Sequence, residues 1–202
     1  MSTRSPAATP GAVLGRSPIE QNKLGVLLFI LSEVVFFGAL VLSYVYYRAS
    51  VPDVASQSRQ LDVPLTGIFS LFLFSSSFTI WRADKALARG SYNAFLAWLG
   101  ATIALGLVFL VGQGLEYLRL FEDNTTASSS LFGSAFFTLT GFHGFHVLGG
   151  LVALSILLGL GIRGVFKGGR TAAAEAISLY WHFVDAVWVV LFAVIYLWAL
   201  VG

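Results

Sequence analysis

The sequence contains no cysteine, and Met1 is its only methionine. Without thiolates the chain cannot form disulfides, iron–sulfur clusters or the dinuclear copper centres that need paired thiolates. Charge is also scarce, since 11% of the 202 residues are charged, whereas soluble domains carry roughly 25%. A chain with so few charges cannot cover a globular surface with polar groups, which excludes the soluble fold classes.

Hydrophobic residues make up 57% of the chain, and the mean hydropathy is +0.82. The net charge is +2, and basic residues form no run with interleaved aromatics. The sequence therefore gives no indication of nucleic-acid binding and predicts a protein that is solvated by lipid.

Five apolar segments are long enough to cross a bilayer, for which a helix needs about 20 residues. They are residues 24–47, 63–81, 92–118, 131–162 and 176–201. Helices are expected because each one satisfies its own backbone hydrogen bonds in lipid. The third and fourth segments exceed the needed length and should tilt or project beyond the bilayer. The predicted fold is an all-α integral membrane protein with five transmembrane helices.

Residues 1–22 are rich in Pro, Ser and Ala near their start and lack the apolar core of a signal peptide. They are interpreted as a flexible N-terminal tail, followed by a transmembrane domain over residues 23–202.

The positions of the basic residues predict the orientation, because short cytoplasmic loops are enriched in Lys and Arg. Nine of the twelve basic residues lie in the tail and in the second and fourth loops. These nine are Arg4, Arg16, Lys23, Arg82, Lys85, Arg89, Arg163, Lys167 and Arg170. The other side holds Arg48, Arg59 and Arg119 together with several acidic residues. The N-terminus is therefore expected to be cytoplasmic and the C-terminus outside.

Six ionisable residues fall inside the expected spans, where a charge costs about 2.5–3.5 kcal/mol on insertion scales. They are Glu33, Glu116, His143, His146, His182 and Asp185, and they include every histidine of the chain. At 1.5 Å rise per residue, Glu33 and His146 come to similar depths in the cytoplasmic half, which predicts a hydrogen bond between them. Glu116 lies one turn from Arg119, and we expect these two to pair.

Two pairs of these residues have helical spacing. His143 and His146 stand three residues apart, and so do His182 and Asp185, so each pair can share one helix face. Trp188 continues the second face. Glycines surround the histidine pair, and small residues allow helices to approach closely in lipid.

These groups allow three interpretations: a metal site, a proton path and a set of interhelical hydrogen bonds. A metal site would need all the ligands to converge, and the Glu-x-x-His signature of helical di-iron bundles is absent. A proton path would relay along Glu33, the histidines and Asp185. In the third reading the groups form interhelical hydrogen bonds, and the residue chemistry favours this structural role.

Three sequence strings and two polar positions carry a resemblance to a known family. Residues 28–37 read LFILSEVVFF, residues 133–150 read GSAFFTLTGFHGFHVLGG, and residues 179–188 read LYWHFVDAVW. Gln113 and Glu116-Tyr117 fall on the third span. Together these resemble subunit III of the haem–copper oxidases from about Gly25 to the C-terminus. The chain resembles the five-helix bacterial form, since longer members carry two further N-terminal helices.

The resemblance implies a non-redox subunit of a proton-pumping cytochrome c oxidase in a bacterial plasma membrane. Catalytic and metal-binding residues are expected in the partner subunits, which hold the haem and copper. Subunit III packs against subunit I, alongside subunit II and the other oxidase subunits, and supports proton uptake. The residue corresponding to Glu33 reacts with hydrophobic carbodiimides in the family. Ser32-Glu33 is typical of cytochrome c oxidases, while quinol oxidases tend to have Ser-Asp there.

The resemblance also implies bound phospholipid in a cleft between helix groups, expected here between the first two spans and the other three. Arg82 and Arg163 at cytoplasmic helix ends, and Arg48 on the outer side, are candidates for lipid headgroup contacts. Gln113, Glu116 and the other membrane polar residues are expected to have structural roles. Alternatives are a subunit of a quinol oxidase or nitric oxide reductase, a self-contained proton or ion transporter, and a metal-dependent membrane hydrolase.

Overall fold

The computed structural model describes residues 18–58, 61–166 and 171–201, and every regular element in these ranges is helical. The elements are α1 (Pro18–Ser50), α2 (Pro52–Gln57), α3 (Val63–Ala88), α4 (Tyr92–Glu122), α5 (Leu131–Ile162), α6 (Ala172–Leu191), the π-helical turn η2 (Phe192–Leu197) and α7 (Trp198–Val201). Arg4, Arg16, Arg59, Lys167 and Arg170 lie outside the described residues. So does most of the predicted tail, and the division between tail and domain stays a prediction.

Five helices are long and apolar enough to cross a membrane, as predicted. α1 begins at Pro18 and so takes in the last residues of the predicted tail. α3 runs seven residues beyond the predicted end of its span, because the amphipathic turns after Trp81 stay helical. The fifth span is formed by α6, η2 and α7 in sequence. The short helix α2 has no counterpart in the sequence-based prediction.

Three of the spans start with a polar N-cap residue, whose side chain accepts a hydrogen bond from a free backbone N–H of the first turn. Asp62 accepts from the N–H of Leu65 at 3.0 Å at the start of α3. Ser130 does the same for Gly133 at α5, and Thr171 for Ala174 at α6. Gly90, with φ of +72°, reverses the chain between α3 and α4, a conformation that a residue with a Cβ adopts only with strain.

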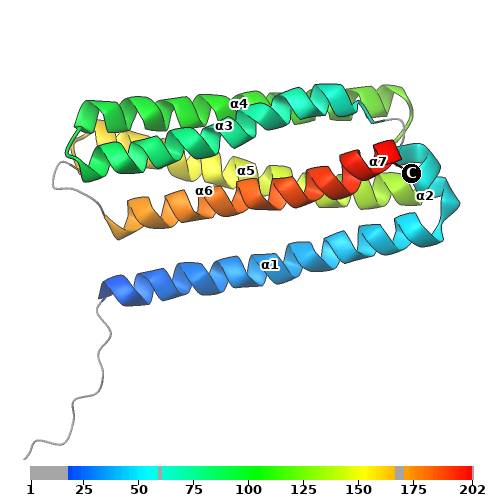
Figure 1. Ribbon diagram of the computed structural model, residues 1–202, viewed down its shortest axis with the longest axis horizontal. Coiled ribbons are helices and arrows are strands. Elements are labelled where there is room, and N and C mark those ends of the chain that lie inside the picture. The colour runs from blue at the N-terminus through cyan, green and yellow to red at the C-terminus, as the bar shows by residue number, and fades with distance from the viewer. Residues whose placement is uncertain (1–17, 59–60, 167–170, 202) are drawn as a thin grey trace, which may run out of the picture.

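The helices form a group of four with α1 along its outside (Figure 1). α3 and α4 pack along each other, α5 packs on α4, and α6 contacts both α3 and α5. α1 contacts α5 and α6. The expectation of a cleft between the first two spans and the other three is therefore wrong. The second span belongs with the third and fifth, because the hydroxyl groups of α3 bond to side chains of α6.

A tryptophan from α6 fills the centre of the four-helix group. Trp181 is fully buried and lies against Gly106 of α4 and Gly150 of α5. A Cβ at either glycine would come within 2.8 Å of a carbon of the Trp181 ring. The two glycines thus provide the space for the indole, as small residues do at close helix contacts in membranes.

We predict that Gly106→Ala and Gly150→Ala lower the thermal stability of the purified protein. The added methyl overlaps the Trp181 ring, and overpacking of this kind costs about 1–3 kcal/mol. Gly114→Ala on α4 is the matched control, because a Cβ there meets nothing within 4 Å. Thermal unfolding in detergent measures the effect, and equal stability of all three variants would contradict the prediction.

Candidate functional site

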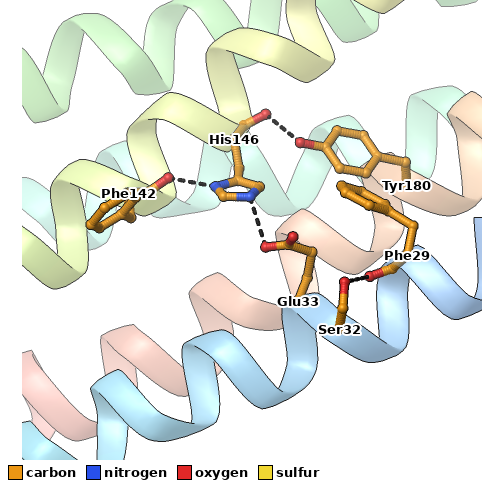
Figure 2. Close-up of polar contacts among 6 residues, drawn as sticks. All are labelled: Phe29, Ser32, Glu33, Phe142, His146 and Tyr180. Atoms are coloured by element: carbon orange, nitrogen blue, oxygen red, sulfur yellow. Dashed lines mark hydrogen bonds and ion pairs between the residues drawn. The ribbon is translucent and has the colours of Figure 1, made fainter.

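Glu33 of α1 and His146 of α5 form a contact inside the membrane (Figure 2). The carboxyl Oε2 lies 3.0 Å from the imidazole Nε2, which confirms the predicted pairing. The other ring nitrogen, Nδ1, lies 2.7 Å from the carbonyl oxygen of Phe142 and must carry a hydrogen to bond there. Nε2 and the carboxyl group therefore share the remaining proton.

The pair has no net charge wherever that proton resides. A carboxylic acid donating to a neutral ring and an imidazolium donating to a carboxylate both sum to zero. Neutrality matters because an isolated charge in lipid is strongly unfavourable. The side chains of His146 and Glu33 keep only 14% and 17% of their surface exposed.

Aromatic rings enclose the Glu33–His146 pair. Phe37 meets the imidazole edge to face at 5.1 Å between ring centroids. Tyr180 of α6 donates its hydroxyl to the His146 carbonyl oxygen at 3.0 Å, and its ring lies beside Phe29 of α1 (Figure 2). Three spans that are distant in sequence therefore meet at this point.

His143 has different surroundings from His146, although the two were expected to share one face. Its ring is fully buried and stacks on Trp188 of α6 at 4.8 Å, with Phe109 of α4 edge to face at 5.9 Å. Within the described residues neither ring nitrogen of His143 has a hydrogen-bond partner. The two side chains are only about 60° apart around the axis of α5, but α1 borders one edge of that sector and α4 and α6 border the other, so the two rings contact different helices.

Glu116 does not pair with Arg119, contrary to the expectation. Its two carboxyl oxygens accept from the Thr66 hydroxyl of α3 at 2.9 Å and from the Tyr196 hydroxyl of η2 at 2.6 Å. Arg119 pairs with Asp62 at the start of α3. Glu116 faces the bundle interior and is 3% exposed, whereas the Arg119 side chain is 55% exposed.

Gln113 joins α4 to α5 one turn before Glu116. Its Nε2 donates to the Thr140 carbonyl oxygen at 2.7 Å and to the Tyr117 hydroxyl at 3.2 Å. The Tyr117 hydroxyl in turn lies 2.7 Å from the Thr140 hydroxyl. A Cβ at Gly144 would lie 2.9 Å from Gln113 Oε1, so the two helices approach closely here.

His182 and Asp185 face α3 together, as their spacing predicted, and both contact Ser77. The His182 Nδ1 lies 3.1 Å from the Ser77 hydroxyl, which also donates to Asp185. Trp188 continues this face and donates its indole N–H to Ser70 at 2.8 Å.

The hydroxyl groups of α3 are the structural residues that the sequence analysis missed. Trp181 of α6 donates to Ser76 at 2.8 Å, and the Thr79 hydroxyl lies 2.8 Å from the Thr102 hydroxyl of α4. A serine run at 75–77 inside an apolar span was the available signal. Hydroxyl groups in such a span bond to neighbouring helices.

Arg48 is buried and bonds within the protein. Its guanidinium donates to the Ser58 hydroxyl and to the Trp198 carbonyl oxygen, and it lies 5.0 Å from the Trp198 ring centroid. With 5% of its surface exposed, Arg48 joins the end of α1 to α7, and this geometry argues against the predicted lipid contact. Arg82 and Arg163 are exposed at the opposite end of the bundle.

The described residues do not gather three or more His, Cys, Asp or Glu side chains in a group that could hold a metal. The polar residues instead form separate interhelical contacts. These distances support the interpretation in which the polar residues form interhelical hydrogen bonds.

We predict that Glu116→Leu destabilises the protein by about 1–3 kcal/mol, the range for leaving a buried polar partner unsatisfied. The change leaves the Thr66 and Tyr196 hydroxyls without their acceptor. Adding Thr66→Val and Tyr196→Phe to Glu116→Leu should recover part of the lost stability, because neither buried hydroxyl group is then left without an acceptor. Thermal unfolding measures each variant, and additive losses in the triple variant would contradict the network.

Comparison with known proteins agrees with this architecture. The family model for cytochrome c oxidase subunit III matches residues 16–200. The cytochrome c oxidase subunit 3 of Corynebacterium diphtheriae is 37% identical over 192 residues, which cover 94% of each chain. That of Synechocystis sp. is 38% identical over 192 residues, which cover 94% of this chain and 81% of the relative. The chain therefore belongs to the cytochrome c oxidase subunit III family, whose members are subunits of a multi-subunit respiratory oxidase in the membrane.

Proposed function

We propose that this chain is the non-redox subunit III of a bacterial cytochrome c oxidase, with haem and copper held by partner subunits. It packs against subunit I, binds structural phospholipid and supports proton uptake by its partner. The observation that carries the proposal is the Glu33–His146 contact, which uses an acid–base pair to join α1 to α5. The carboxyl and imidazole groups inside the spans, which are the side chains able to transfer protons or bind metal, here join the helices of this chain to one another.

The packing around the histidines supports a role without redox chemistry. A haem needs an axial histidine beside a cavity large enough for the macrocycle. The His143 ring lies between Trp188 and Phe109, with centroid distances of 4.8 and 5.9 Å. His146 is engaged through both ring nitrogens.

The proposed lipid binding is supported by an apolar cavity of about 320 Å³ between α1 and α6. Its lining includes Val34 and Phe37 from α1 and Phe183 and Val187 from α6. Gly38 adds open space, because nothing lies within 4 Å of the position of its absent Cβ. A hydrocarbon chain suits this lining, since water would find no polar partner there.

The proposed membrane is the bacterial plasma membrane, with the N-terminus cytoplasmic and the C-terminus outside. Among described side chains, Arg82, Lys85 and Arg89 lie at the end of α3, and Arg163 follows α5. α2 and α7 lie at the opposite end of the bundle (Figure 1). The positive-inside rule assigns the basic end to the cytoplasm.

We predict that alkaline phosphatase fused after Gly202 is active in a bacterial host, because that enzyme folds only outside the cytoplasm. The same fusion within the loop at residues 89–91 should be inactive, since positive-inside topology retains that loop. Enzyme assays on intact cells measure both fusions. The reverse pattern of activity would overturn the orientation.

The function is tested by purifying the tagged chain from its native membrane in mild detergent. We expect haem-containing subunits to copurify and the complex to oxidise reduced cytochrome c. A complex that oxidises only quinol would identify a different oxidase. Proton conduction by the purified chain alone in liposomes would favour a transporter and contradict the proposal.

We predict that Glu33→Ala reduces retention of the chain or its lipid on the complex more than it slows initial turnover. The change removes the carboxyl partner of His146 and weakens the attachment of α1 to α5. Ser32→Ala is the matched control, because the Ser32 hydroxyl bonds only to the Phe29 carbonyl of its own helix among the described contacts. Subunit stoichiometry, lipid content and oxygen uptake are measured together. Immediate loss of activity in a fully assembled complex would contradict the proposal.

A further inference from the structure

Two basic and three aromatic side chains form a cluster at the cytoplasm-assigned end of α3 and α4. The aromatic–basic cluster consists of Phe78, Trp81, Arg82 and Lys85 from α3 and Trp98 from α4. Phe78 and Trp81 are 55% and 43% exposed, and both cations are exposed as well. None of these residues takes part in the contacts among α1, α5 and α6 described above.

Each cation of the cluster lies over its own indole. The Arg82 guanidinium carbon is 5.2 Å from the Trp98 ring centroid, and the Lys85 Nζ is 4.4 Å from that of Trp81. Phe78 lies between the two indoles, with its centroid 5.7 Å from Trp81 and 6.4 Å from Trp98. Cation–π contacts of this kind hold a cation in place while its N–H groups remain free to bond an anion.

Polarity changes in one direction along the exposed face of α3. Leu71, Phe78 and Lys85 are spaced by seven residues, so they lie on one face at intervals of about 10 Å. Leu71 is 64% exposed, and Arg82 extends the basic end of the same face. The order along this face, from apolar through aromatic to basic, is the order of a phospholipid from acyl chain to phosphate.

The acidic residue nearest in sequence lies on another side of the helix. Asp84 accepts from the Ser178 hydroxyl of α6 at 2.5 Å, which directs its carboxyl group toward α6 and away from the exposed face. Arg82 and Lys85 thus present two positive charges to whatever covers the cluster. A phosphodiester, with its single negative charge shared by two free oxygens, complements two cations three residues apart. An uncharged headgroup such as glycerol leaves that negative charge uncompensated, whereas choline would place a third positive charge beside Arg82 and Lys85.

We propose that the aromatic–basic cluster binds an acidic phospholipid of the phosphatidylglycerol type. The phosphate is held between Arg82 and Lys85, and an acyl chain runs along Phe78 and Leu71. This site is separate from the apolar cavity between α1 and α6, which offers no charged group. The inference rests on the proposed lipid binding and names the lipid class and the residues that select it.

The test is native mass spectrometry of the purified oxidase complex, titrated with phosphatidylglycerol and with phosphatidylcholine of identical chains. We expect the wild-type complex to retain phosphatidylglycerol preferentially. Arg82→Gln/Lys85→Gln should weaken that retention roughly tenfold or more, because each basic residue near the membrane surface contributes substantially to binding of anionic lipid. Phosphatidylcholine should be retained weakly by the wild-type complex, because its choline adds a positive charge beside the two cations, and its retention should change less in the double variant.

Two further variants locate the site. Trp98→Leu keeps both charges but removes the support of the Arg82 guanidinium, and we expect an intermediate loss. Arg163→Gln removes one exposed charge at the same end of the bundle, and we expect wild-type retention. Equal losses in Arg163→Gln and in the double variant would show general attraction to basic protein and overturn the proposal.

Only complexes that keep their haem spectrum and subunit composition are scored, so the outcome is separate from that of the proposed function. Unchanged phosphatidylglycerol retention in an intact double-variant complex overturns this inference alone. Release of a protein subunit from that variant, with lipid retention unchanged, would identify the cluster as a protein interface and also overturn it. Inorganic phosphate added as a competitor should not displace the lipid, because it lacks the acyl chain.

Discussion

Lipid offers no hydrogen-bond partner, and this constraint organises the polar residues of the chain. A donor or acceptor inside the spans is stabilised by a partner on another helix or in its own backbone, and among the described residues the ring nitrogens of His143 are an exception. Glu33 meets His146, Glu116 meets Thr66 and Tyr196, and Asp185 meets Ser77. Each of these contacts joins different helices, and all but the one between Thr66 and Glu116 join helices that are not consecutive in the sequence. The polar groups therefore specify which helices are neighbours, a choice that apolar attraction alone leaves open in lipid.

The contacts divide the bundle into a firmly joined group and one peripheral helix. α3 bonds to α6 at several hydroxyl groups along its length, and α4 and α5 complete that group around Trp181. α1 is attached by fewer polar contacts, at Glu33 near its middle and at Arg48 near its end. The apolar cavity with α6 lies between these two points in the sequence of α1. In this arrangement Glu33 is one of two polar residues that attach α1 to the other helices.

The proton shared by Glu33 and His146 gives the pair two forms that are equally neutral. A pair of this kind can change the position of its proton without placing net charge in the membrane. The Phe142 carbonyl keeps one hydrogen on Nδ1 of His146, so the exchange is confined to Nε2 and the carboxyl group. The pair can therefore hold α1 against α5 at no cost in net charge.

Much of the architecture follows from sequence alone. The length of the apolar segments predicted five spans, since only a helix of that length crosses hydrocarbon with its backbone satisfied. The similar depths of Glu33 and His146 predicted their contact, and the spacing of His182 and Asp185 predicted their shared face. The depth of a residue and its spacing from a neighbour are positions along a helix axis. They can be calculated from residue numbers because each residue adds a constant rise along a nearly straight helix. The sequence motifs around Glu33, His146 and Asp185 indicated the family, because a motif is read directly from the order of the residues.

Only the tertiary structure decided which helices are neighbours and how each is rotated. Glu116 was expected to bond with Arg119 on its own helix, but its face of α4 turns inward to Thr66 and to Tyr196 in the π-helical turn. No proline or glycine in residues 192–197 signals that turn. His143 and His146 likewise face different helices, and Arg48 is buried against Trp198 across 150 residues of sequence. Rotation about the helix axis depends on the side chains of all the neighbours at once, so the sequence of one segment does not determine it.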